Sequence, residues 1–235
     1  MKPLEEATRV ASARDDKMHI PDGFLNTGTS IAAWAASAGG LGYALRRVNR
    51  TLGERQVPLM GVTAAFIFAA QMLNFTVIGG TSGHLLGGAL AAILLGPWAG
   101  MLVLTSVLTI QALLFQDGGL LALGANIFNM AIVGVLVGWA AYRLLARLLG
   151  GQTWALFVSG FLAGWLSVVL AALAAAAELA LSGTLAWQVV IPAMGGIHAL
   201  IGIGEGMITV GVLAFLRVAR PDLLTLGQTA QMSKG

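Results

Sequence analysis

The sequence contains no cysteine and very few charged residues. Without cysteine, neither a disulfide bond nor a metal site with thiolate ligands can form. Aspartate, glutamate, lysine and arginine make up only 10% of the 235 residues, whereas a soluble domain usually carries about a quarter. Most of the protein surface must therefore face something other than water.

Lysine is absent between Lys17 and Lys234. A P-loop needs a lysine after its glycine-rich turn, so this chain cannot bind ATP in that way. The HExxH motif of zinc proteases and the GxSxG elbow of serine hydrolases are also missing. Any ATP that drives this protein must be hydrolysed by a partner, and no motif indicates an enzyme.

Long apolar runs dominate what is present, and 57% of the residues are hydrophobic. Several runs approach the roughly 20 helical residues that cross a hydrocarbon core, and they are continuous rather than alternating. Helices satisfy their own backbone hydrogen bonds in lipid, so the sequence predicts an all-α polytopic membrane protein with about seven transmembrane helices. The expected helices span roughly 27–45, 57–77, 84–95, 98–115, 123–142, 154–181 and 189–217. The third is too short to cross alone and is expected to start inside the fold, between Gly83 and Gly96-Pro97.

Basic residues indicate the orientation of these helices. Past Met18 they fall in three places, after the first, fifth and seventh helices: Arg46, Arg47, Arg50, Arg55, Arg143, Arg147, Arg217, Arg220 and Lys234. If the seven segments alternate, these places share one side, which the positive-inside rule makes cytoplasmic. The loops at 78–83, 116–122 and 182–188 carry no lysine or arginine. We therefore expect an inner-membrane protein with its N-terminus outside and its C-terminus in the cytoplasm. The pI near 9.8 does not indicate nucleic-acid binding, because the basic residues lie at helix ends.

Residues 1–17 do not fit this orientation, because they place four basic residues outside. They also lack the apolar core of a signal peptide. They are either a short translocated tail or the product of a misassigned start, and we favour translation that begins at Met18. The chain then divides into the polar extension 1–17, a membrane domain 18–217 and a short cytoplasmic tail 218–235.

The three histidines are rare polar groups in an apolar chain, and such groups often mark function in membrane proteins. His84 is expected to open the helix 84–95 on the outer side. His19 precedes the first helix on the same side, so the two can converge. A lone intramembrane histidine more often packs or donates a hydrogen bond than binds a metal. His198 and Glu205 share one face of the last helix, where structural and functional roles both stay open.

Two sequence blocks resemble motifs of a known family. Residues 18–25, MHIPDGFL, are similar to the N-terminal signature of the CbiM/NikM family, and residues 79–88, GGTSGHLLGG, resemble its second histidine motif. Further similar stretches extend to about residue 217. Proteins of this family are the substrate-binding membrane subunits of energy-coupling-factor importers for cobalt and nickel.

The resemblance implies a metal site made of nitrogen atoms. Its ligands would be the free amine of Met18, the amide nitrogen and imidazole of His19, and the imidazole of His84. Four nitrogen atoms in a plane suit Ni²⁺ or Cu²⁺, and cobalt is implied by the resemblance alone. The amine is available only if Met18 is the first residue, since an amide nitrogen has no such lone pair. Candidates for a supporting shell are Asn74, Thr81, Ser82, Gln111 and Asn126, with ordinary interhelical hydrogen bonding as the alternative for each.

By resemblance, the protein is a high-affinity Ni²⁺ or Co²⁺ binding subunit that captures the metal, its transported substrate, at the outer face. The expected partners are a transmembrane coupling protein, two ATPase subunits and a small auxiliary membrane subunit. The auxiliary subunit is expected to be separate, because the chain ends soon after the last helix. One alternative is an autonomous ion-coupled carrier that uses Glu178 and Glu205, although Glu178 falls near a helix end. A membrane enzyme that uses His198 and Glu205 is another, but it lacks a nucleophile or cofactor motif.

Overall fold

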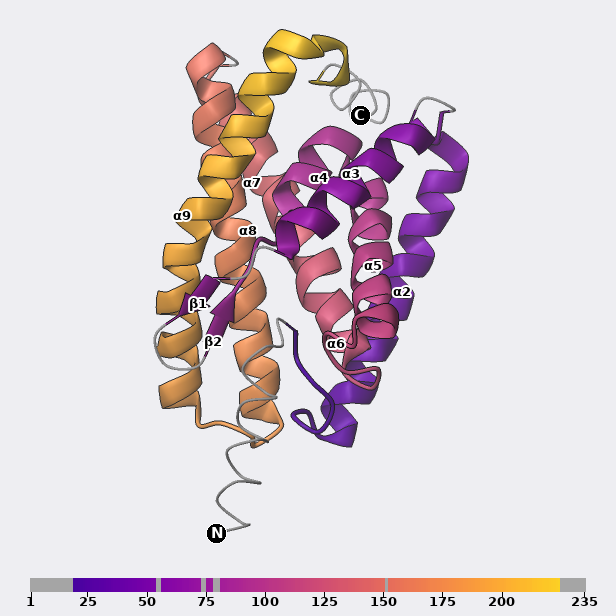
Figure 1. Ribbon diagram of the computed structural model, residues 1–235, viewed down its shortest axis with the longest axis vertical. Helices are drawn as coiled ribbons and strands as arrows, with labels where there is room; N and C mark the ends of the chain where they lie inside the picture. The colour runs from indigo at the N-terminus through magenta and orange to yellow at the C-terminus, as the bar shows by residue number, and fades with distance from the viewer. Residues whose placement is uncertain (1–18, 54–55, 73–74, 78–80, 151, 225–235) are drawn as a thin grey trace.

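The protein is a bundle of helices with one short hairpin (Figure 1), and its computed structural model describes residues 19–53, 56–72, 75–77, 81–150 and 152–224. The strands β1 (Phe75–Val77) and β2 (Thr81–Gly83) pair antiparallel. The helices are α2 (Thr27–Thr51), α3 (Gln56–Gln71), α4 (Gly88–Leu95), α5 (Pro97–Leu114), α6 (Leu123–Asn126), the π-helical η1 (Ile127–Gly134), α7 (Val135–Leu148), α8 (Thr153–Leu181) and α9 (Trp187–Ala219). The elements α6, η1 and α7 form one continuous helix, Leu123–Leu148.

Four of the helices in the described part of the chain are long and apolar enough to cross a membrane: Pro97–Leu114, Leu123–Leu148, Thr153–Leu181 and Trp187–Ala219. Large apolar side chains point outward from them; Leu200, for example, is 70% exposed. Such a surface is stable in lipid and costly in water. The prediction of an all-α membrane protein is confirmed apart from the small hairpin. The number of crossing helices and their orientation stay predictions.

The structure corrects two of the predicted helices. The helix expected at 57–77 ends at Gln71, and Phe75–Val77 forms a strand instead. The helix expected at 84–95 begins only at Gly88, so His84 does not open it. Gly87 precedes α4 in the left-handed conformation, with φ 76°, which interrupts any helix that starts earlier.

The helices α2 and α7 also continue past their expected ends at residues 45 and 142. Both extensions carry arginine, whose long side chain can reach polar surroundings while the helix continues beside apolar neighbours. A glycine lies just beyond each helix, at Gly53 and Gly150. Helix ends in this chain therefore follow the glycines rather than the first charges.

The short helix α4 lies at the centre of the bundle, and all eight of its residues are buried. It packs against α5, α7 and α8. A Cβ atom at Gly138 of α7 would lie 2.7 Å from the Ala89 Cα, so this contact requires glycine. Gly96, with φ 79°, and Pro97 separate α4 from α5, as the sequence predicts. The short third helix is therefore confirmed as an interior element.

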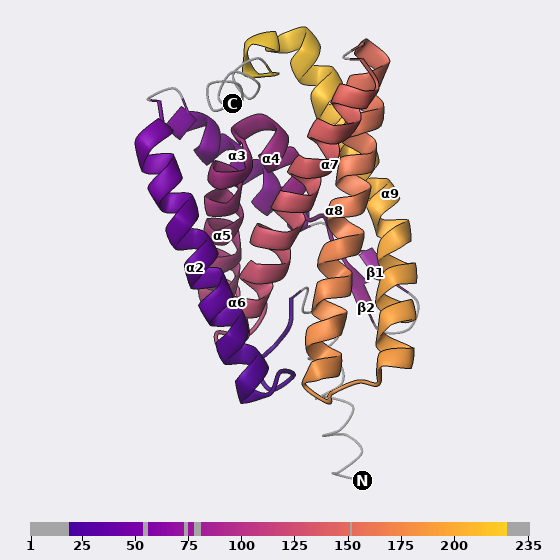
Figure 2. The same ribbon diagram turned by 180° about the vertical axis from the view of Figure 1, so that it is seen from behind.

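Figures 1 and 2 show two distinct ends of the bundle. The last turns of α2, α7 and α9 meet at one end, and they carry Arg50, Arg147 and Arg217. The connections α5–α6 and α8–α9 lie at the opposite end, together with the segment before α2. The predicted separation of basic residues from the other loops therefore matches the two ends of the fold.

Candidate metal centre

The segment before α2 is fixed against the α5–α6 connection. The Asp22 carboxylate accepts hydrogen bonds from the backbone N–H groups of residues 120, 121 and 122, at 3.1, 2.8 and 3.0 Å. Ile20 and the Asn126 side chain exchange two hydrogen bonds, both of 3.1 Å. On the other side, the Asn26 amide donates to Leu181 O, and the Thr184 hydroxyl donates to Phe24 O. The segment that carries His19 is thus held between the α5–α6 connection and the α8–α9 connection.

His19 is buried, with 7% of the residue exposed, and two of its nitrogen atoms face one carboxylate. Its backbone N–H donates to Asp117 Oδ1 at 3.3 Å, and its ring Nδ1 lies 3.1 Å from Asp117 Oδ2. These are the two His19 nitrogen atoms that the family resemblance assigns to the metal. Both therefore point to the Asp117 carboxylate, whose negative charge would favour a cation nearby.

His84 lies close to His19 in space, although it does not lie on a helix. The two imidazole centroids are 4.9 Å apart, with the rings inclined by 60°. The Nδ1 atom of His84 lies 2.8 Å from Leu85 O. A carbonyl oxygen only accepts, so Nδ1 must donate, and the lone pair of the neutral ring is then on Nε2. The predicted convergence of the two histidines is present, and His84 has the tautomer of a ligand that binds through Nε2.

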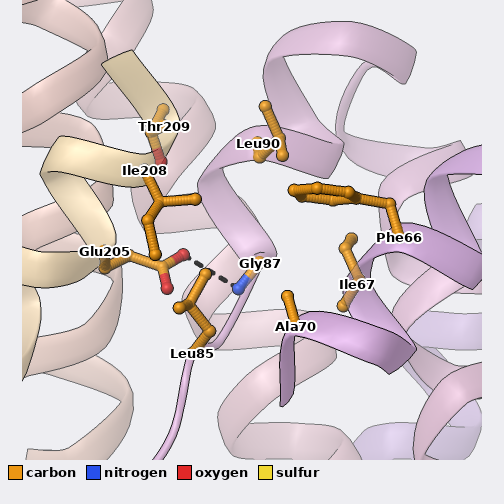
Figure 3. A pocket seen from close by; sticks show the side chains of 9 residues that line it. All are labelled: Phe66, Ile67, Ala70, Leu85, Gly87, Leu90, Glu205, Ile208 and Thr209. Carbon is orange, nitrogen blue, oxygen red and sulfur yellow. Dashed lines mark hydrogen bonds between the residues drawn. The ribbon is translucent and has the colours of Figure 1, made fainter. Parts of the chain in front are cut away.

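Glu205 of α9 holds the segment that carries His84. Its Oε2 accepts from Leu86 N at 2.9 Å, and its Oε1 accepts from Gly87 N at 2.8 Å. Figure 3 shows this carboxylate reaching Gly87 among apolar side chains of α3 and α4. Glu205 is only 1% exposed, so both of its oxygens rely on these partners. Gly87 is also required sterically, because a Cβ atom there would lie 2.8 Å from Ile67.

A chain of two amides holds the same segment from the other side. The Gln71 side chain of α3 donates to Leu86 O at 2.8 Å, and the Gln111 side chain of α5 donates to Gln71 Oε1 at 2.9 Å. Both glutamines are fully buried. The backbone of Leu86 is thus bonded on both sides, through its N–H to α9 and through its carbonyl to α3.

The predicted supporting residues differ in how they relate to these histidines. Asn126 binds the residue after His19, and Gln111 acts on the His84 segment only through Gln71. Thr81 and Ser82 belong to β2, which pairs with β1 and ends at Gly83, directly before His84. Met18 and Asn74 lie outside the residues that the structure describes.

Three carboxylates are part of this arrangement although sequence reasoning gave them no role in the site: Asp22, Asp117 and Glu205. Their partners lie about a hundred residues away along the chain, so no local pattern predicts the contacts. The sequence did contain one signal, which is the presence of acidic residues in so apolar a chain. An acidic residue is costly to bury unless it is hydrogen-bonded, so each of them indicates a site with bonding partners.

A cavity of about 100 Å³ adjoins the two histidines. It is lined by the third histidine, His198, and by side chains of α6, η1, α8 and α9, among them Asn126, Asn129, Met130 and Met194. Within the described ranges, no three His, Cys, Asp or Glu side chains come together as a metal-binding group. A complete site around His19 and His84 would therefore need donors of another kind, such as backbone nitrogen atoms.

Comparisons with known proteins agree with this geometry. Residues 19–223 match the family model CbiM, described as the cobalt uptake substrate-specific transmembrane region. A putative metal transport protein of Haloquadratum walsbyi is 46% identical over 209 residues, covering 88% of this chain and 93% of that protein. A putative fused nickel transport protein NikMN of Archaeoglobus fulgidus is also 46% identical over 209 residues, covering 88% of this chain and 68% of that protein.

A solved structure extends the likeness to three dimensions. The crystal structure of a transition metal transporter superposes with a TM-score of 0.80 at 38% identity, covering 93% of this chain and all of that one. These relatives are transport proteins and not enzymes. The chain therefore belongs to the CbiM family of cobalt and nickel transport proteins of the membrane.

Proposed function

We propose that this protein is the high-affinity Ni²⁺ or Co²⁺ binding subunit of an ATP-driven energy-coupling-factor importer. The observation that carries the proposal is the approach of the His19 and His84 rings to 4.9 Å, with both His19 nitrogen donors directed to one place. Imidazole and amide nitrogen atoms suit Ni²⁺ and Co²⁺ better than they suit the hard ions Mg²⁺ and Ca²⁺. The amine of Met18 would complete the four-nitrogen site.

The proposed side of capture is the outer face of the cell membrane. The α5–α6 and α8–α9 connections, which hold the segment that carries His19, lie at the end of the bundle opposite the arginine-rich helix ends (Figure 1), and the positive-inside rule assigns those helix ends to the cytoplasm. A metal ion from outside would thus reach His19 and His84 without crossing the bundle first.

Partners follow from the missing P-loop, because ATP binding must be provided by other chains. We expect two ATPase subunits, a transmembrane coupling protein and a small auxiliary membrane subunit. The autonomous ion-coupled carrier has less support. Glu205 is fully engaged by two backbone N–H groups, and Glu178 by Asn129, as expected of carboxylates with structural roles.

Calorimetric titration of the purified protein with Ni²⁺ and with Co²⁺ tests the site. His84→Ala should weaken binding by more than about a hundredfold, since even the loss of a group that orients a ligand costs about 10- to 100-fold. His198→Ala is the matched control, because it removes a histidine from the same cavity. Equal affinity of His84→Ala and the unchanged protein would exclude His84 from the site.

A transport assay separates the importer from the carrier. Proteoliposomes that contain this chain alone should not accumulate ⁶³Ni²⁺ against a gradient, with or without an imposed proton or sodium gradient. Accumulation driven by such a gradient would instead establish the ion-coupled carrier.

A further inference from the structure

We propose that the cavity next to His19 and His84 contains a second, inner cation site around His198 and Asn129, through which the metal passes on its way inward. This inference rests on the proposed function, because it assumes that metal enters at the two outer histidines. The cavity of about 100 Å³ far exceeds the roughly 10–15 Å³ that a single water molecule needs. It can therefore hold a metal ion with part of its hydration shell.

His198 presents a metal-binding nitrogen atom in this cavity. Its Nδ1 lies 2.9 Å from the carbonyl oxygen of Met194, one turn earlier in α9. The carbonyl only accepts, so Nδ1 must donate, and the lone pair of the neutral ring is on Nε2. The same arrangement selects Nε2 in His84. Two histidines that line one cavity are thus fixed in the same ligand tautomer.

Asn129 supplies an oxygen donor that lacks a protein partner. The residue is 3% exposed, and its Nδ2 donates to Glu178 Oε2 at 2.7 Å. This hydrogen bond orients the amide and leaves Oδ1 buried, with no hydrogen-bond partner in the described part of the chain. A buried acceptor without a hydrogen-bond partner destabilises the folded protein. A cation, or a water molecule bound to one, would satisfy it.

Glu178 lies behind Asn129 and accepts the hydrogen bond of its amide group. It is buried in α8 and contacts the cavity through Asn129 rather than directly. A carboxylate behind an amide ligand both orients the amide and strengthens its oxygen as a donor. Met130 and Met194 add polarisable thioether groups to the lining, which nickel and cobalt tolerate better than magnesium does.

The donor set predicts weaker binding than at the outer site. All donors that line the cavity away from the outer histidines are neutral, and no cluster of three His, Asp or Glu side chains forms among the described residues. A transported ion must bind well enough to enter and weakly enough to leave. A tight site at His19 and His84 followed by a weaker one at His198 meets both requirements.

The test compares two quantities for each variant. One is the Ni²⁺ affinity of the purified protein, and the other is the rate of Ni²⁺ uptake by cells in which the variant replaces the original gene. His198→Ala and Asn129→Leu should each keep the Ni²⁺ affinity of the purified protein within about twofold, while the initial rate of ⁶³Ni²⁺ uptake falls by about tenfold or more. Phe215→Ala is the matched control, because this residue of α9 is 66% exposed and does not line the cavity. It should change neither quantity. Amounts of each variant in the membrane are measured by immunoblot.

A second measurement looks for the inner site directly. The His84→Ala protein should retain weak Ni²⁺ binding, which the added change His198→Ala should reduce by about tenfold. Normal uptake in both single variants would show a cavity that holds water only, and would overturn the proposal. If one single variant does not fold, the other decides. Absence of tight Ni²⁺ binding in the unchanged protein would instead refute the proposed function itself.

Discussion

Replacement of Glu205 by glutamine should weaken metal binding without a change in any ligand. The carboxylate accepts one hydrogen bond on each oxygen, from Leu86 N and Gly87 N. Glutamine offers one oxygen and an NH₂ group, and the NH₂ group cannot accept. One backbone N–H group therefore loses its partner in a buried site, which costs about 1–3 kcal/mol.

The size of the effect depends on where this cost appears. If it falls on the segment that carries His84, the Ni²⁺ affinity should drop by about 5- to 150-fold. Titration calorimetry on the purified protein measures this directly. Glu178→Gln is the matched control, because it changes a second buried carboxylate, which accepts a hydrogen bond from the side chain of Asn129 and not from the His84 segment. The Ni²⁺ affinity of this variant at the proposed His19 and His84 site should stay within about twofold of the original value.

A double-mutant cycle decides whether Glu205 acts through His84. In a protein that already carries His84→Ala, the further change Glu205→Gln should have almost no effect on residual binding, since residues that act through one contact are not additive. Unchanged affinity in the single variant, or full additivity in the double variant, would refute the reasoning.

Four further outcomes are expected. Mass spectrometry of the natively produced protein should give a mass that starts at Met18, and a version forced to keep residues 1–17 should bind Ni²⁺ far more weakly, since an acylated amine cannot bind metal. Ni²⁺ affinity should fall as the pH is lowered, because protons compete for the nitrogen ligands, and titrations at several pH values measure this. Gly87→Ala should destabilise the protein by about 1–2 kcal/mol or more in thermal unfolding, because φ is 76° there and Ile67 is too close. A cysteine at Arg50 should resist impermeant reagents in intact cells, and its labelling would reverse the orientation.

Sequence reasoning predicted the long helices well because their apolar runs are unambiguous. It was wrong at Phe75–Val77, where the apolar run continues but the backbone turns into a hairpin. Periodicity cannot separate a short apolar strand from the end of a helix. Phenylalanine, threonine and valine favour strands, and Gly79-Gly80 is a hairpin signal, so the composition could have indicated the break.

The candidate site was predictable only in part, for a related reason. His19 and His84 were identified because histidine is rare in an apolar chain and because both fall in recognised motifs. Their support comes from Asp117 and Glu205, which reach them across 98 and more than 110 residues of sequence. Contacts of that range depend on how the helices pack, and a single sequence does not record the packing.

The backbone of Leu86 connects two helices through its two hydrogen-bond partners. Its carbonyl is held by Gln71 of α3 and its N–H by Glu205 of α9, at 2.8 and 2.9 Å. If α3 and α9 move apart, this residue must either follow one helix or lose one of the two bonds. Both outcomes shift the backbone two residues from His84. A protein that pushes on the outer surface of either helix can thus shift the proposed ligand His84 without touching it.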